Sequence, residues 1–155
     1  SAWDTTNVTN MQRTFENCTA LTTLNISTWD TRKVKSTFSM FDNCGITSLD
    51  LSGWHTDSLE NVSYMFDLCR ALVTLDIRNF DFSNISQYQD MFRECYALRE
   101  IRLDNCNNDT IKKIISATAG LPRGENADGT KGKIFCKSSE ATGLEAPNGW
   151  EFKFV

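Results

Sequence analysis

Hydrophobic and polar positions recur along the chain with a fixed period. Four cysteines, separated by 26, 25 and 26 residues, each follow a similar phenylalanine-containing segment: Cys18, Cys44, Cys69 and Cys95. Counted from an opening aromatic residue, the repeating units begin at Trp3, Trp29, Trp54 and Phe80. A fixed period of this length is typical of repeat architectures, in which each repeat is one supersecondary unit.

The first half of each unit has the spacing of a short helix. Apolar residues stand five, eight and twelve positions after the opening aromatic, although the second unit has Thr37 and the adjacent Phe38 at the middle position. Steps of three to four residues describe the buried stripe of a helix. Asp57, followed three residues later by Glu60, resembles a capping box. We therefore expect two or three helical turns in each unit.

The second half of each unit has the spacing of a strand. In the third unit Leu72, Leu75 and Ile77 follow the cysteine, and the final pair, two residues apart, predicts a short strand with one buried face. The second unit reaches this pattern earlier because one residue is missing after Cys44. A coil this short cannot bury its apolar side alone, so neighbouring coils must stack with their strands in a parallel sheet.

The pattern changes after the fourth unit. Cys106 takes the opening position of a fifth unit, and Ile111 and Ile114 keep the helical phase, but glycines and Pro122 then interrupt the pattern across a polar loop. Two further strands are predicted at the segments LysIlePheCys, 133–136, and TrpGluPheLysPheVal, 150–155.

The chain therefore divides into a repeat region and a cap within one domain. Residues 1–104 form four tandem repeats, and residues 105–155 form a partial fifth repeat and a C-terminal cap. Trp3 already lies inside the first unit, so we expect a neighbouring domain or subunit to cover the open N-terminal end.

The full repeat motif resembles a known family. The motif is similar to the BspA-like leucine-rich repeats of bacterial surface proteins. It consists of an aromatic residue, then Met-Phe, two residues, Cys, two residues, Leu, two residues and Leu-Asp-Leu. The segment DMFRECYALREIRL, residues 90–103, is a clear instance. The resemblance covers Trp3 to Asp104. It implies an α/β solenoid of leucine-rich-repeat type, a horseshoe segment with parallel strands on the concave side, short helices on the convex side and a C-terminal cap. It also implies extracellular display on a bacterial cell and contact with a partner, and it supplies no catalytic residues.

Composition and charge narrow the classes of partner. The net charge of -4 argues against nucleic acid, because a phosphate backbone requires clustered lysine and arginine. Apolar runs are too short for direct membrane insertion of this chain. Metal-binding spacings such as CxxC are absent, and His55, the single histidine, has no neighbouring nucleophile motif. We expect no metal, no cofactor and no catalytic site, hence not an enzyme.

Two columns of repeated residues have a structural and a functional interpretation. The four periodic cysteines are expected to be reduced and buried, whereas Cys106 and Cys136 lie off this column and are the better candidates for a disulfide. The opening aromatic column could form a sugar-stacking platform, but its phase matches a buried turn position, which favours a role in the core.

The exposed face of the strands is the candidate binding surface. Alternate strand residues point away from the core, and they form three polar columns: Thr23, Ser48, Thr74 and Glu100; Asn25, Asp50, Asp76 and Arg102; and Ser27, Ser52, Arg78 and Asp104. We expect a protein or glycan partner to contact this surface, because solenoids commonly bind on the concave side.

Two alternative functions follow from the same sequence. The chain could be a structural spacer, or a fragment of a larger surface protein whose activity lies in a missing domain. It could also be a hydrolase based on paired carboxylates, for which Asp50 and Asp76 stand one strand apart. That chemistry requires a shared pocket and one acid with a raised pKa.

Overall fold

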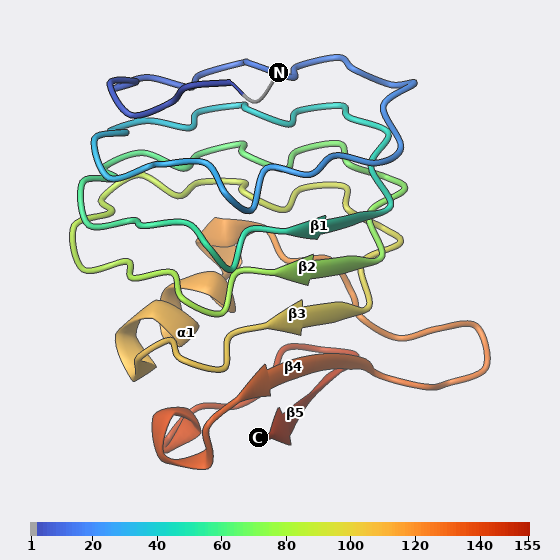
Figure 1. Ribbon diagram of the computed structural model, residues 1–155. Coiled ribbons are helices and arrows are strands. Elements are labelled where there is room, and N and C mark those ends of the chain that lie inside the picture. Colours follow the sequence, from blue (N-terminus) through green and yellow to red (C-terminus); the bar gives the residue numbers. More distant parts are fainter. Residues whose placement is uncertain (1–2) are drawn as a thin grey trace.

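A computed structural model describes residues 3–155, and residues 1 and 2 of the predicted repeat region 1–104 lie outside the described part. The protein is an α/β structure with one five-stranded parallel sheet and few helices. The strands follow sequence order in the sheet: β1 (Ser48–Asp50), β2 (Thr74–Asp76), β3 (Glu100–Arg102), β4 (Gly132–Cys136) and β5 (Trp150–Phe154). Figure 1 shows the coils stacked one below another from the N-terminus, with the strands along one side.

The sheet register repeats the sequence period. Leu49 of β1 pairs with Leu75 of β2, which pairs with Ile101 of β3. All three side chains are buried, while the residues on either side of each are at least partly exposed. One residue type therefore stacks on its equivalent in the next coil, as expected for parallel strands one repeat apart.

The strand expected in the first unit does not form, which corrects the sequence prediction. Residues 23–25 are exposed or half-buried and lie outside the sheet. The amide of Gly45 donates to the Cys18 carbonyl (3.1 Å), whereas the amide of Thr47 donates to the Thr22 carbonyl (3.3 Å). The register of hydrogen bonds between the first and second coils therefore shifts at the connection that lacks one residue. A regular ladder of strand hydrogen bonds cannot continue through such a shift.

The short helices expected in the four repeats are also wrong. Within residues 3–104 the structure has no helix, and the expected helical segments are runs of turns at 12–17, 38–43, 63–68 and 89–94. The second and sixth residue of each run has a positive φ, as at Ser39 (51°) and Asn43 (53°). Such residues interrupt a right-handed helix. The capping box predicted from Asp57 and Glu60 accordingly starts no helix.

Backbone hydrogen bonds in these turns alternate between two kinds of partner. The amides of Thr37, Ser39 and Phe41 donate to carbonyls of the next coil at 2.9–3.1 Å. The amides of Met40 and Asp42 donate within their own coil, to the carbonyls of Thr37 (3.0 Å) and Ser39 (3.3 Å), and the Asn43 amide again donates to the next coil. An α-helix instead bonds each amide to the carbonyl four residues earlier in the same segment. We call this side of the stack the turn ladder.

The turn ladder has a consequence for the shape of the stack. Directly hydrogen-bonded backbones lie about 4.8 Å apart, whereas packed helices need 8–10 Å. Because the coils bond to each other both in the sheet and along the turn ladder, the two sides have similar spacing. The widening of a helical convex side, which underlies a horseshoe, is therefore missing from repeats one to four.

A helix does form where the turn ladder ends. Helix α1 (Asn108–Ile114) begins after Asn107, whose side chain accepts a hydrogen bond from the Thr110 amide, and it buries Ile111 and Ile114 as predicted. Two short 3₁₀ helices follow, η1 (Ala117–Ala119) and η2 (Ser138–Ala141). The η1 carbonyls still accept from backbone amides of the fourth coil. Helix α1 instead bonds to that coil through the side chains of Thr110 and Lys113, which contact the Phe82 backbone, and it also packs beside η2. The helix therefore has the room that the preceding coils lack.

Ladders of equivalent side chains fill the core. Phe41, Phe66 and Phe92 are fully buried and stack with ring centroids 5.6 and 5.8 Å apart. Such parallel-offset contacts add to the free energy of burying each ring. Phe15, in the first coil, continues the stack but is only half-buried.

The cysteine column lies beside the phenylalanine ladder. Cys44, Cys69 and Cys95 are buried free thiols, as predicted, and Cys18 at the end of the column is half-buried. Burial raises the pKa of Cys69 to about 12. Its thiol donates to the Phe41 carbonyl at 3.0 Å. Cys106 and Cys136 are also buried free thiols, so the bridge for which they were the candidates is not formed.

The opening aromatic column is core only in the later coils. Trp54 and Phe80 are 2% and 1% exposed, and the Trp54 indole donates to the Ile26 carbonyl (3.1 Å). Trp29 is half-buried, and Trp3 is 62% exposed although it stacks on Trp29 at 5.5 Å. The expectation of a buried column is wrong for Trp3. That a neighbouring domain or subunit covers this end stays a prediction.

Candidate functional site

The predicted binding residues fall into two groups in the structure. Thr23 and Asn25 are exposed but outside the sheet. The others lie on or next to the outer face of β1 to β3, where a shallow depression of about 240 Å³ crosses the strands. Its lining includes six of them: Ser48, Asp50, Thr74, Asp76, Glu100 and Arg102. The Thr74 hydroxyl donates to the Ser48 hydroxyl at 2.7 Å, so part of this surface is already internally paired.

An ionic network occupies the edge of this face. Arg78 donates to the Asp76 carboxylate, and its Nε lies 3.5 Å from Asp104. Arg102 also pairs with Asp104 (Nε to Oδ2 2.9 Å), and its guanidinium lies over the Phe135 ring, 4.8 Å from the centroid. Asp104 is only 8% exposed, so the expectation that it points into solvent is wrong. It holds two arginines in place.

The carboxylate pair considered for hydrolysis lacks the required asymmetry. Asp50 is exposed, and hydrogen bonds from Ser52 lower its pKa. The Ser52 amide donates at 2.8 Å. Asp76 is engaged by Arg78. A proton-donating acid would need a carboxyl whose pKa is raised, in a shared pocket, and Asp50 has the opposite shift on an open surface.

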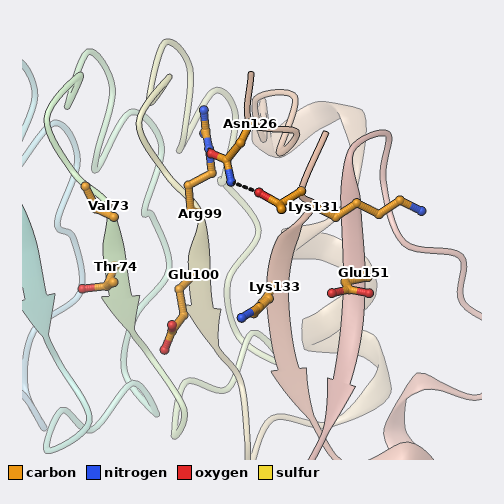
Figure 2. A pocket seen from close by; sticks show the side chains of 9 residues that line it. Val73, Thr74, Arg99, Glu100, Asn126, Lys131, Lys133 and Glu151 are labelled. Atoms are coloured by element: carbon orange, nitrogen blue, oxygen red, sulfur yellow. Dashed lines mark hydrogen bonds between the residues drawn. The ribbon is translucent and has the colours of Figure 1, made fainter. Parts of the chain in front are cut away.

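A larger groove lies at the C-terminal end of the same face. It has a volume of about 470 Å³ and is lined by residues of β2 to β5, by Arg99, and by the loop that precedes β4. The lining residues are Val73, Thr74, Arg99, Glu100, Asn126, Thr130, Lys131, Lys133 and Glu151. Figure 2 shows Thr74, Glu100, Lys133 and Glu151 side by side on successive strands, with Arg99, Asn126 and Lys131 along one border. We call it the C-terminal groove.

The groove's positive charges have few internal partners. Within residues 3–155, Arg99, Lys131 and Lys133 make no salt bridge within 4 Å. Glu151 instead pairs with Lys153 at 2.9 Å. The pKa of Glu151 is lowered, first by the hydrogen bond from Lys153 and then by the charges of Lys131 and Lys133. The lining thus combines three cations with two carboxylates, Glu100 and Glu151, which is a small excess of positive charge on an acidic protein.

One buried tryptophan anchors the loop that borders the groove. The Trp150 indole donates to the Pro122 carbonyl at 2.7 Å. The ring lies against the backbones of Gly124 and Gly132, where an added Cβ would come within 2.6 and 2.8 Å of indole carbons. At the loop tip, Asn126 and Thr130 bond to each other through backbone and side chains. The groove wall is therefore tied to β5.

The sequence analysis did not identify the groove residues beyond Thr74 and Glu100. The signal for Lys133 and Glu151 was present, because both alternate with apolar residues in the two predicted C-terminal strands. Extending the parallel sheet by two strands places them in the column of Glu100, as the register confirms. Asn126 and Lys131 lie in an irregular loop, and no periodicity indicates where they point.

The described residues contain neither a cluster of metal ligands nor a helix that could span a membrane. No group of three or more His, Cys, Asp or Glu side chains in residues 3–155 is arranged to hold a metal ion. No helix in that same part of the chain has the length and apolar character needed to span a membrane.

Fold and site together define a repeat protein whose parallel strands carry an open, polar face. The chain belongs to the family described as "Mycoplasma protein of unknown function, DUF285", whose model matches residues 1–106, more than half of its length. The match covers the four repeats and ends at Cys106, the first residue of the expected fifth unit. Comparisons with curated proteins and with solved structures find no match.

Proposed function

We propose that this protein is a non-catalytic binding module displayed on the bacterial cell surface, and that its outer sheet face contacts a protein or glycan partner. In this proposal the stacked coils are a solenoid related to BspA-like leucine-rich repeats, with a turn ladder in place of the convex helices. The observation that carries the proposal is the C-terminal groove, because it presents charges that the described part of the fold does not neutralise.

The state of the surface supports the proposal. The ionic network of Asp76, Arg78, Arg102 and Asp104 holds these side chains in defined positions before any partner arrives. Preorganised side chains lose less conformational entropy on binding than mobile ones. Beside this network, Asp50 and Lys133 are exposed and make no ion pair in the described residues. A rigid centre with unpaired charges around it suits a polar recognition surface.

The test begins with the purified chain on protein and glycan arrays. For any ligand found, two charge reversals probe the face, Asp50→Lys in the centre and Lys133→Glu in the groove. Asp76 is not reversed, because loss of its pairing with Arg78 would disturb the network itself. We expect at least one reversal to weaken binding by roughly tenfold or more, the equivalent of about 1.4 kcal/mol.

Matched controls are reversals of exposed charges away from the face, Asp57→Lys in a turn and Lys112→Glu on α1. These should leave affinity within about twofold, since isolated surface charges contribute little. The proposal is wrong if neither array yields a ligand, or if the control reversals reduce affinity as much as the reversals on the sheet face.

A further inference from the structure

The sheet register builds a row of alternating charge along the floor of the C-terminal groove. Glu100 of β3, Lys133 of β4 and Glu151 of β5 are aligned partners in neighbouring strands. Adjacent parallel strands lie about 4.8 Å apart, so acceptor, donor and acceptor groups follow one another at short, regular spacing. Figure 2 shows these side chains next to one another in the groove.

Lys133 is the central member of this row and is left without an ion pair. Its neighbour Glu151 takes Lys153 as partner at 2.9 Å, and among the described residues no carboxylate oxygen lies within 4 Å of the Lys133 ammonium. The Lys133 side chain is exposed. It therefore offers three hydrogen-bond donors and a full charge to a molecule in the groove.

The border of the groove adds two cations. The Arg99 guanidinium donates to the carbonyls of Tyr96 (2.8 Å) and Leu98 (2.7 Å) and to the Asn126 side chain. These bonds orient Arg99 without neutralising it, since a carbonyl or amide oxygen carries no net charge. Lys131 follows the tip of the same loop and is exposed. Arg99, Lys131 and Lys133 thus all line one groove in a chain of net charge -4.

We propose that the C-terminal groove binds an acidic glycan, through a sugar ring that carries a carboxylate. Lys133 binds the carboxylate and Lys131 adds positive charge at the border of the groove. The Thr74 hydroxyl, which donates its own proton to Ser48, and the Glu100 carboxylate accept hydrogen bonds from the ring hydroxyls. The inference rests on the proposed function and deepens it, because it assigns a ligand class to one part of the sheet face.

The lining favours a sugar over an acidic peptide. Val73 is the single apolar side chain among the nine residues that line the groove. Peptide recognition draws most of its energy from buried apolar or aromatic anchors, for which this groove has no pocket. A polyhydroxylated ring instead presents groups that donate and accept at close intervals. That pattern matches the hydroxyl, carboxylate and ammonium groups of Thr74, Glu100 and Lys133.

The experiment measures the affinity of the full chain for three probes by calorimetric titration. They are a trisaccharide of galacturonic acid, the same trisaccharide with its carboxyl groups reduced to alcohols, and a glutamate-rich peptide of equal charge. The site variant is Lys131→Gln with Lys133→Gln. The control variant, Lys112→Gln with Lys137→Gln, removes the same charge from two exposed lysines outside the groove. Thermal unfolding verifies that both variants fold.

The expected result is saturable binding of the acidic trisaccharide that weakens at high ionic strength. The site variant should bind it at least about tenfold more weakly, because charge-assisted hydrogen bonds are lost. The control variant should bind like the parent chain, and the reduced trisaccharide should bind at least about tenfold more weakly than the acidic one.

Four outcomes overturn the inference: no binding of the acidic trisaccharide, equal binding of the reduced trisaccharide, equal loss in the control variant, or tighter binding of the peptide. The two proposals fail separately. An array ligand that responds to Asp50→Lys, found together with no binding of the acidic trisaccharide, would leave the proposed function standing and remove this inference. Failure of both reversals on every array ligand would remove the proposed function itself.

Discussion

The first and third coils carry the same residue pattern but differ in how far that pattern is buried. Trp3 is 62% exposed and its equivalent Trp54 is 2% exposed. The first coil has no strand after its cysteine, whereas the third forms β2 (Thr74–Asp76). The third coil has a coil on either side, and in the described residues the first has a neighbour on one side only (Figure 1). Stacking, rather than local residue preference, therefore produces the regular structure.

The largest expected effect distinguishes the interior of the phenylalanine ladder from its N-terminal end. Phe66→Ala removes a fully buried ring from between Phe41 and Phe92, and we expect a loss of about 3–5 kcal/mol in the free energy of unfolding. Phe15→Ala removes a half-buried ring and should cost clearly less. Urea unfolding of both variants measures the difference. Equal losses would show that stacking on both sides adds nothing.

A smaller effect is expected at the junction between the first and second coils. An added Cβ at Gly53 would lie 2.1 Å from the Ser27 carbonyl oxygen, so Gly53→Ala must push the first coil away, at a cost of about 1–3 kcal/mol. Hydrogen exchange should become faster in residues 3–28 and change little in the third and fourth coils. Thr28→Ala, at an exposed neighbouring position, is the control. Uniformly faster exchange along the whole chain would contradict this local effect.

The smallest expected effect concerns the aspartate column next to the core phenylalanines, in the second and third coils. Asp67 pairs with Arg93 (Oδ1 to Nε 3.0 Å), but the equivalent Asp42 has a buried Oδ1 without a hydrogen-bond partner. Burial, together with the charges of Asp67 and Glu16, raises the pKa of Asp42. We expect Asp42→Asn to stabilise the protein by about 1 kcal/mol at pH 7, because it removes a poorly solvated charge.

The pH dependence of the free energy of unfolding tests the sign of this prediction. A carboxyl with a raised pKa binds its proton more tightly in the folded state, so it costs stability as pH rises from the ordinary aspartate value through the raised one. The advantage of Asp42→Asn should therefore be present at neutral pH and vanish in acid. Asp67→Asn, which breaks the pairing with Arg93, should destabilise the protein. Thermal unfolding between pH 3 and 8 measures both variants; an advantage that persists in acid would refute the assignment.

The sequence by itself determined the repeat and the residues that fill its interior. The repeated pair of apolar residues two positions apart that follows each cysteine places Leu49, Leu75 and Ile101 in register, and a chain of this length can bury such residues only by stacking its coils. The strands at β4 and β5 and the start of α1 also follow from local signals, because alternation and an N-cap act within a few residues.

Only the tertiary structure decided what the first half of each repeat becomes and where the groove lies. A spacing of three to four residues fits both a helix and a run of turns, and the bonding of each coil to the next selects the turns. Likewise, Lys131 and Asn126 line the same groove as Lys133 and Glu100 because they stand on a loop anchored on Trp150. Contacts of this kind join distant segments, whose meeting depends on the packing of the whole chain and leaves no period in the sequence.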